Sequence, residues 1–515
     1  MTGAESLLRT LLANQIDISF MNPGTSEMQF VSALDRIPAM RGILCLFEGV
    51  CSGAADGYAR MTGKPASTLL HLGPGLGNAL ANFHNARKAR SPIVNIVGEH
   101  STQHLGHDAP LTADIEAFAH PVSGWVRTLA SATAMGETAA VAIDAAIGPP
   151  GQVATLIIPA DFSWSEVGEP GHALPPRKLA VPPREQILAI ANTLRSGRPA
   201  GILLGGHSLT APALHAAARI AAATGASIYA NRNSGRMARG LGVAPATRIP
   251  YFPEAAQSLL GNLAHLILVE SKPPISFFGY PGLRSTLAPP ECSLDVLAAE
   301  GEDGLAALEA VADELGALHS IETANPDRSP LPAGERLTAD AIGRAVAALV
   351  PEHAIFSDES VSSNERIWPH LAAAPAHDYL PVTGGSIGQG LPAALGAAVA
   401  CPTRKVIALE ADGSAMYTLQ ALWTMAREKL DVTTVILANR RYRILDIEMK
   451  RTGSGPVGPL ADRMLDLSGP APDWVKLSEG LGVRAARAAT ADEFIREFRA
   501  AMREPGPALI EAVLD

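Results

Sequence analysis

The sequence predicts an α/β protein of three domains, each built on a parallel sheet flanked by helices. Short apolar runs typical of strands alternate with longer helix-like stretches along all 515 residues. Two proline-rich stretches, 166–185 and 324–337, have the composition of interdomain linkers. The expected domains are therefore residues 1–165, 186–323 and 338–515, and each is large enough to bury a core of its own.

The expected strands are short apolar runs. They lie at 42–47, 66–72, 92–98 and 153–160 in the first domain, at 201–206, 226–230 and 266–270 in the second, and at 353–358, 405–411 and 432–438 in the third. Before them, Glu5 and Arg9 interrupt the apolar residues of the N-terminus. That pattern predicts an amphipathic helix leading to a strand and not a signal peptide.

Composition excludes several classes of protein. A net charge of −10 argues against nucleic-acid binding, which normally needs a basic face. The apolar stretch at 391–401 is about half as long as a membrane span. The four cysteines contain no CxxC pair and are expected to be small buried side chains in a reducing compartment. We expect a soluble, cytoplasmic protein that binds neither nucleic acid nor membranes.

Two polar segments are predicted to meet at one edge of the third sheet. Asp412 follows the strand at 405–411, and Asn439 follows the strand at 432–438. Apolar residues from Leu419 to Ala426 recur at helical spacing between them. A right-handed β-α-β crossover of this length brings both polar residues to the carboxyl edge of the sheet, where open α/β sheets bind ligands.

The groups at this edge suit a magnesium ion that holds a diphosphate. Mg²⁺ prefers hard oxygen ligands, and it finds a carboxylate in Asp412, an amide oxygen in Asn439 and a main-chain carbonyl in Arg441. Gly413 would let the backbone approach a phosphate, and Ser414 begins a predicted helix whose N-terminal amides favour an anion. Taken singly, these elements are also typical of a capped helix and of a turn after a strand.

The aspartate-glycine-serine element, followed by an asparagine 27 residues after the aspartate, resembles the thiamine-diphosphate motif of 2-oxo-acid decarboxylases, acetolactate synthases and pyruvate oxidases. The family usually has a glycine where this chain has Ala411 and a second asparagine where it has Ala438. Neither departure removes an expected metal ligand. The resemblance implies that thiamine diphosphate and Mg²⁺ bind at this edge.

A second motif lies in the first domain. The stretch from Glu48 to Arg60 resembles the family signature of a glutamate followed, after five residues, by Ala-Ala-Asp-Gly-Tyr-Ala-Arg. The resemblance implies that Glu48 is the carboxylate that hydrogen-bonds N1′ of the cofactor's aminopyrimidine and so promotes removal of the proton from C2. Without the resemblance, Glu48 would read as a carboxylate placed favourably at a helix N-terminus.

The resemblance covers most of the chain and is closest to benzoylformate decarboxylase. It places Thr25 in the loop that lines the substrate site and His71 at the position of a catalytic histidine. It implies that the carbonyl of Gly385 accepts from the cofactor's 4′-amino group and that Ile387 is the bulky residue beneath the two rings. Ser362 is the expected donor to the diphosphate. A satisfied structural histidine, a glycine-rich turn and a helix cap are the alternatives.

Two positions depart from the family pattern and concern the substrate. A second histidine of benzoylformate decarboxylase is replaced near Phe278, and Leu445 stands where pyruvate decarboxylases carry a glutamate. The pyruvate decarboxylase subtype is therefore disfavoured. Ile444, Leu445 and Glu448 are expected to face the substrate or its lid.

We therefore expect a thiamine-diphosphate- and Mg²⁺-dependent enzyme that decarboxylates a 2-oxo acid without oxidation, with carboligation also possible. The resemblance implies a homodimer or homotetramer with active sites between chains. The sequence leaves open which 2-oxo acid is used and whether the central domain binds FAD through the glycine-rich stretch 201–208.

Three other functions compete with this expectation. An acetolactate synthase-like carboligase shares the same chemistry up to the loss of CO₂. A non-catalytic relative that only binds thiamine diphosphate would not need Glu48. A dinucleotide-binding oxidoreductase is suggested by the glycines of 73–77 and by Glu99, but the spacing is GxGxG and Pro74 lacks an amide.

Overall fold

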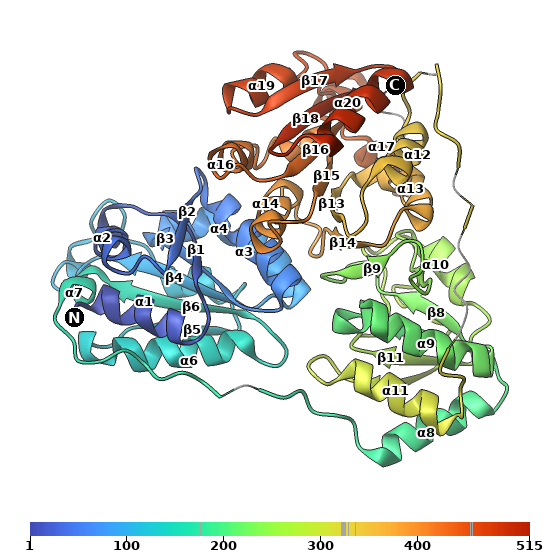
Figure 1. Cartoon of the computed structure of the whole chain (residues 1–515), viewed down its shortest axis with the longest axis horizontal. Helices are drawn as coiled ribbons and strands as arrows, with labels where there is room; N and C mark the ends of the chain where they lie inside the picture. The colour runs from blue at the N-terminus through green and yellow to red at the C-terminus, as the bar shows by residue number, and fades with distance from the viewer. Residues whose placement is uncertain are drawn as a thin grey trace.

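The computed structural model describes residues 1–175, 177–320, 326–327, 329–334, 336–453, 455 and 457–514. It confirms the predicted α/β class, with three sheets in which most strand pairs are parallel (Figure 1). In the described residues, no helix is both long and apolar enough to cross a membrane.

The first sheet is entirely parallel, with strand order β2-β1-β3-β4-β6-β5. Its strands are β1 (Ile18–Asn22), β2 (Arg41–Leu44), β3 (Ala66–His71), β4 (Ile93–Glu99), β5 (Trp125–Thr128) and β6 (Val153–Pro159). Its helices are α1 (Gly3–Ala13), α2 (Met28–Arg36), α3 (Glu48–Thr62), α4 (Leu72–Ala89), α5 (Ile115–Ala119), α6 (Met135–Ile147) and α7 (Ala160–Trp164). Helices α3 and α4 bury one face of the sheet, and α1, α2 and α6 bury the other.

The central sheet is also parallel, in the order β10-β8-β7-β11-β12. Its strands are β7 (Ala200–Leu204), β8 (Ser227–Ala230), β10 (Thr247–Arg248), β11 (His265–Val269) and β12 (Ser293–Ala298). Its helices are α8 (Arg184–Arg195), α9 (Ala211–Thr224), α10 (Pro253–Leu260) and α11 (Gly304–Glu314).

The third sheet has the order β17-β18-β16-β15-β13-β14-β9. Its strands are β13 (Ile355–Glu359), β14 (His377–Pro381), β15 (Val406–Ala411), β16 (Val432–Ala438), β17 (Arg484–Ala488), β18 (Ala508–Val513) and β9 (Met237–Arg239). Its helices are α12 (Ala339–Leu349), α13 (Asn364–Ile367), α14 (Gly390–Ala400), α15 (Asp412–Ala415), α16 (Ala421–Arg427), α17 (Arg443–Arg451), α18 (Pro459–Leu465), α19 (Trp474–Gly480) and α20 (Ala491–Arg503). The edge strand β9 is antiparallel to β14 and comes from the segment expected to belong wholly to the central domain.

The predicted strand runs all contain strands, with ends shifted by up to three residues, as at 42–47, where β2 spans Arg41–Leu44. One helix prediction was wrong. The single helix expected after Asp412 is broken into α15 and α16, and Leu419 lies in the turn between them. Described residues of the first proline-rich stretch lie outside helices and named strands up to Arg184, where α8 begins. The second stretch lies partly outside the described residues.

The first and third domains of the chain dock through α3 and α14, which lie side by side (Figure 1). Their contact uses small residues. A Cβ added to Gly57 would lie 2.2 Å from the carbonyl oxygen of Ala393, and one added to Gly396 would lie 1.9 Å from that of Ala54. Backbone at this distance leaves no room for a side chain, so the glycine of the Ala-Ala-Asp-Gly signature is needed for the docking.

Candidate active site

Thr25, Glu48 and His71 meet at the carboxyl edge of the first sheet. Thr25 follows β1, Glu48 begins α3 after β2, and His71 ends β3, and these three strands are neighbours. A Cβ on Gly75 would lie 3.3 Å from Glu48 Oε1 and 3.6 Å from His71 Cβ. A Cβ on Gly24, next to Thr25, would lie 2.3 Å from the His71 ring. We call the group formed by Thr25, Glu48 and His71 the first half-site.

Glu27 belongs to the first half-site, although sequence reasoning gave it no role. Its side chain is fully buried, and Oε2 lies 2.8 Å from His71 Nδ1 and accepts a hydrogen bond of 2.7 Å from the amide of Gly24. Burial raises the pKa of Glu27, while the neighbouring His71 acts to lower it. A carboxylate facing Nδ1 favours the proton on that nitrogen and leaves Nε2 available to a ligand. Its signal in the sequence is its place two residues after Thr25, in the loop that follows β1.

Asp412 and Asn439 lie at the carboxyl edge of the third sheet, as predicted. Strands β15 and β16 are parallel neighbours, with Ala411 paired to Leu437. The buried carboxylate of Asp412 accepts from the amide of Gly413 at 2.9 Å and from that of Arg440 at 2.6 Å. Burial raises the pKa of Asp412, and these two amides act to lower it. The two predicted segments are therefore in direct contact.

The residues near Asp412 make contacts of their own. Asn439 Oδ1 accepts from the amide of Arg441 at 2.9 Å. The side chain of Arg441 forms ion pairs with Asp446 and Asp462, so only its main chain remains for the predicted ligand role. A Cβ on Gly413 would lie 2.4 Å from the ring of Tyr442, and Ser414 is buried in α15. Helix α15 begins at Asp412, two residues earlier than the predicted start at Ser414.

The loop with Gly385 and Ile387 lies against the same region. Gly385 has a φ of +77°, which favours glycine, and a Cβ there would lie 2.4 Å from the Phe277 ring. The carbonyl of Gly388 accepts from the hydroxyl of Thr418 at 2.9 Å. The loop is thus bonded to the turn that follows α15. We call this loop, residues 383–389, together with Asp412 and Asn439 the second half-site.

The segment before Ser362 also supports the loop. Glu359, buried at the end of β13, accepts from the amides of Gly388 and Gly390, each at 2.6 Å. Burial raises the pKa of Glu359 to about 7, although these amides act to lower it. Glu359 therefore joins the strand that leads to Ser362 to the loop of the second half-site.

Backbone strain is found beside three of the predicted site residues. Leu72 (φ 49°) follows His71, Val361 (φ 45°) precedes Ser362, and Arg440 (φ 56°) follows Asn439. Positive φ costs a non-glycine residue on the order of 1–3 kcal/mol and is most unfavourable for a β-branched residue such as valine. Strain of this kind concentrates at functional sites, where the surrounding structure holds it in place.

The glycine-rich stretch 73–77 does not form a dinucleotide loop. It lies inside α4, which begins at Leu72 directly after β3. Gly73 serves packing, because a Cβ there would lie 2.4 Å from Ala113 Cβ. The dinucleotide alternative therefore lacks the loop that it requires.

Comparison with known proteins shows which family the chain belongs to. Residues 1–118 match the thiamine pyrophosphate enzyme N-terminal TPP binding domain, and residues 363–512 match the C-terminal TPP binding domain. The chain is 50% identical to the "Putative acetolactate synthase large subunit IlvX" of Mycobacterium tuberculosis, over 100% of this chain and 99% of that protein. It is 30% identical to the benzoylformate decarboxylase of Pseudomonas aeruginosa, over 96% and 95% of the two chains.

A solved structure gives the same result for the whole fold. The thiamine diphosphate-dependent 4-hydroxybenzoylformate decarboxylase of Rhodococcus jostii RHA1 superposes with a TM-score of 0.85 at 26% identity, covering 100% of both chains. The chain belongs to the thiamine pyrophosphate enzyme family, which includes benzoylformate decarboxylases and acetolactate synthases.

Proposed function

We propose that this protein is a thiamine-diphosphate- and Mg²⁺-dependent enzyme that decarboxylates a 2-oxo acid without oxidation, in the manner of benzoylformate decarboxylase. The observation that carries the proposal is the presence of two half-sites on one chain. One half-site holds a carboxylate, Glu48, beside a histidine, and the other holds Asp412 beside Asn439. A protein that only binds the cofactor would need the second half-site alone.

The residues of the second half-site fit the diphosphate and the metal ion. Asp412 would supply a carboxylate oxygen to Mg²⁺, Asn439 an amide oxygen and Arg441 a main-chain carbonyl, while water and phosphate would complete the octahedron. Within the described residues, no three His, Cys, Asp or Glu side chains form a metal cluster. The proposed Mg²⁺ site has one carboxylate, that of Asp412, so the diphosphate would supply most of the negative charge around the ion. Gly385 and Ile387 would hold the pyrimidine end.

The residues of the first half-site would handle protons. When bound, thiamine diphosphate supplies a thiazolium carbon that attacks the 2-oxo group and a ring that accepts the electron pair as CO₂ leaves. Glu48 would hydrogen-bond the aminopyrimidine, and Asn78, which donates to Glu48 Oε2 at 2.9 Å, would hold that carboxylate in place. His71, oriented by Glu27, would present Nε2 to the substrate carboxylate or to the product oxygen, with Thr25 beside it.

The side chains around Gly385 favour an apolar or aromatic substrate. Phe277 lies directly on Gly385, and the neighbouring Ile275 and Phe278 are largely exposed. Leu445 is exposed at the position where pyruvate decarboxylases carry a glutamate. Apolar side chains grouped at a polar site are typical of a wall that contacts the substrate.

The stretch 201–208 does not fit the pyrophosphate of FAD. Glu270 is buried and has a backbone φ of +48°. Its carboxylate accepts from the amides of Ser208 at 3.1 Å and Gly304 at 3.3 Å. A Cβ on Gly206 would lie 2.5 Å from Glu270 Oε2. The amides that would face a phosphate are therefore occupied by the chain's own carboxylate, and we infer that the central domain takes no FAD through this loop.

A panel of 2-oxo acids tests the proposed reaction. Purified protein with thiamine diphosphate and Mg²⁺ should convert an aromatic 2-oxo acid to its aldehyde at least about tenfold faster than pyruvate, because a larger apolar side chain buries more area in the apolar wall. Added FAD should change neither rate. Acetolactate from pyruvate as the main product would instead establish the carboligase suggested by the relative that is 50% identical.

The catalytic residues of the two half-sites are not bonded to each other within the part of the chain that the structure describes. In the described residues, no hydrogen bond or ion pair joins Glu48 or His71 to Asp412 or Asn439. Exposed apolar side chains lie beside both, namely Met28 and Leu46 beside the first and Met416, Tyr417 and Leu445 beside the second. We propose that a partner chain covers them, so that each active site combines the first half-site of one chain with the second half-site of another, in a dimer or a tetramer.

Activity should therefore depend on association. Dilution below the dissociation constant of the dimer should abolish turnover, and the loss should follow the mass measured by sedimentation. Mixing Glu48→Gln subunits with Asp412→Ala subunits should restore activity, because one of the two sites of the mixed dimer then carries both native residues. A fully active monomer, or mixed subunits without activity despite proven exchange, would contradict shared active sites.

A further inference from the structure

Helix α4 carries three asparagines on one face, at 78, 82 and 85. The spacing of four and three residues aligns their side chains along the helix. Asn78 donates to Glu48 Oε2 at 2.9 Å. Asn82 donates to the carbonyl of Gly49 at 2.8 Å and to that of Gly388 at 3.1 Å. This asparagine row therefore connects the start of α3 with the loop of the second half-site of the same chain.

Asn85 makes the densest set of contacts in the row. Its Nδ2 donates to the carbonyl of Ser386 at 2.8 Å and to Asn82 Oδ1 at 3.1 Å. Its Oδ1 accepts from the amides of Gly384 at 3.1 Å and Ser386 at 3.2 Å. Asn85 is 0% exposed and Asn82 is 2% exposed, so these bonds are not exchanged with water.

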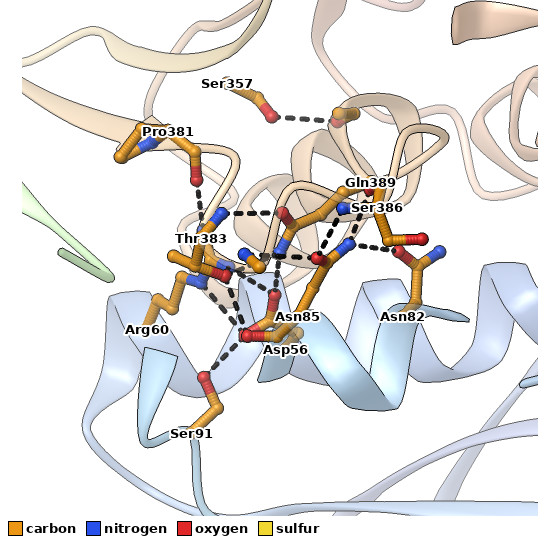
Figure 2. Close-up of polar contacts among 12 residues, drawn as sticks. Asp56, Arg60, Asn82, Asn85, Ser91, Ser357, Pro381, Thr383, Ser386 and Gln389 are labelled. Atoms are coloured by element: carbon orange, nitrogen blue, oxygen red, sulfur yellow. Dashed lines mark hydrogen bonds and ion pairs between the residues drawn. The ribbon is translucent and has the colours of Figure 1, made fainter. Parts of the chain in front are cut away.

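The two ends of the loop are fixed by a second group on α3 (Figure 2). Arg60 forms a buried ion pair with Asp56 and donates to the carbonyl of Pro381 and to the hydroxyl of Thr383, each at 2.9 Å. Gln389 donates to Asp56 Oδ2 at 2.5 Å, the oxygen that also accepts from Arg60. Thr383 in turn donates to the carbonyl of Asn85 at 2.7 Å.

These contacts reach both main-chain groups of Ser386, the amide of Gly384 and the carbonyl of Gly388. In the described residues, no side-chain hydrogen bond reaches Gly385 or Ile387 themselves. The first domain therefore holds the loop from one side, and Glu359 and Thr418 hold it from the third domain. No described hydrogen bond engages the Gly385 carbonyl. Groups that are bonded on all sides but present one free acceptor are typical of a preorganised binding loop. If these hydrogen bonds only stabilised the contact between the two domains, they would not need to be concentrated on residues 384–388.

We propose that Asn82 and Asn85 are positioning residues, which hold the loop 383–389 in the conformation that receives the pyrimidine ring of thiamine diphosphate. This inference rests on the proposed function, because it takes from there the role of Gly385 and Ile387. It adds that cofactor affinity is set by the first domain of the same chain, in addition to the groups of the third sheet.

The test compares thiamine diphosphate with inorganic pyrophosphate, both with Mg²⁺. Pyrophosphate can occupy the region of Asp412 and Asn439 but has no pyrimidine ring. Asn85→Ala should raise the dissociation constant of thiamine diphosphate about tenfold or more, because at least one buried hydrogen bond that shapes the loop is lost. The dissociation constant of Mg²⁺-pyrophosphate, measured by competition, should stay within about twofold of the parent.

Ser52→Ala is the matched control. The Ser52 hydroxyl is buried between the same two helices and donates to the carbonyl of Ala79 at 3.0 Å, but it has no contact with the loop. It should lower the unfolding temperature of the cofactor-free protein without changing either dissociation constant. Asn82→Ala should behave as Asn85→Ala does, with a smaller effect, because it loses one loop contact.

If Asn85→Ala folds poorly, Asn85→Ser replaces it, because the smaller serine side chain still offers a hydroxyl that can donate and accept a hydrogen bond. If thiamine diphosphate and pyrophosphate weaken equally, or if neither weakens, Asn85 supports only the domain contact and the inference is wrong. A parent protein that binds pyrophosphate but not thiamine diphosphate would overturn the proposed function itself. The two failures are therefore distinguishable in one set of titrations.

Discussion

Glu48→Gln should slow hydrogen–deuterium exchange at C2 of bound thiamine diphosphate by a factor on the order of 10²–10⁴, the effect typical of losing a positioned acid–base group. Glutamine keeps the size and one acceptor of the side chain, and Asn78 can still bond it. It lacks the negative charge that favours the protonated aminopyrimidine. The exchange is followed by NMR after acid quench and needs no known substrate.

The same variant should bind Mg²⁺ and thiamine diphosphate nearly as well as the parent, because the groups proposed to hold them lie in the third domain. Glu137→Gln is its matched control. Glu137 is an exposed carboxylate in the first turn of α6 in the same domain, so it represents a helix-start glutamate without a cofactor role. Equal exchange rates in the two variants would assign that lesser role to Glu48 and leave a binding-only protein as the better explanation.

The elements that sequence reasoning predicted well are those with strong local patterns. The strand at 432–438 is apolar except for Thr433 and Thr434, begins with five β-branched residues and is buried on both faces. β16 has the predicted ends. Because parallel strands end at the same edge, the adjacency of Asp412 and Asn439 followed from topology without any side-chain detail.

The elements that were missed depend on contacts between distant segments. Strand β9 has three residues and becomes a strand only because β14 offers it a free edge. The break between α15 and α16 is set by the loop at Gly388, to which Thr418 is bonded. Apolar spacing alone cannot report such a break, since Leu419 in the turn still packs against the core together with Leu422 and Ala426 beyond it.

The candidate site shows the same division. Glu48, His71, Asp412 and Asn439 were found because motifs marked them, and the structure places each at a sheet edge. Glu27 and the asparagine row were not found, because their roles arise from partners 30 to 306 residues away along the chain. In the sequence alone, asparagines at helical spacing look like the solvent-exposed face of a helix. Only the structure shows that α3 and the loop 383–389 cover them.

Asp412→Ala should abolish retention of the cofactor, and this is the sharpest test of the second half-site. The carboxylate is the only charged protein ligand proposed for Mg²⁺, so its loss leaves the diphosphate charge poorly compensated. We expect the dissociation constant of thiamine diphosphate to rise by about 100-fold or more, at or beyond the range seen when groups that merely support a metal ligand are removed. Cofactor that survives gel filtration measures this directly.

Asp462→Ala serves as the control for Asp412→Ala. Asp462 is an exposed carboxylate of the same domain that pairs with the side chain of Arg441, and such surface pairs contribute little stability. Removing it should leave the cofactor bound. Chelation of Mg²⁺ from the parent protein should reproduce the loss seen in Asp412→Ala, since both remove the same bridge between protein and diphosphate. If Asp412→Ala keeps thiamine diphosphate as firmly as Asp462→Ala, the metal site lies elsewhere, and the contact between Asp412 and the Arg440 amide serves only to fix the strained turn after β16.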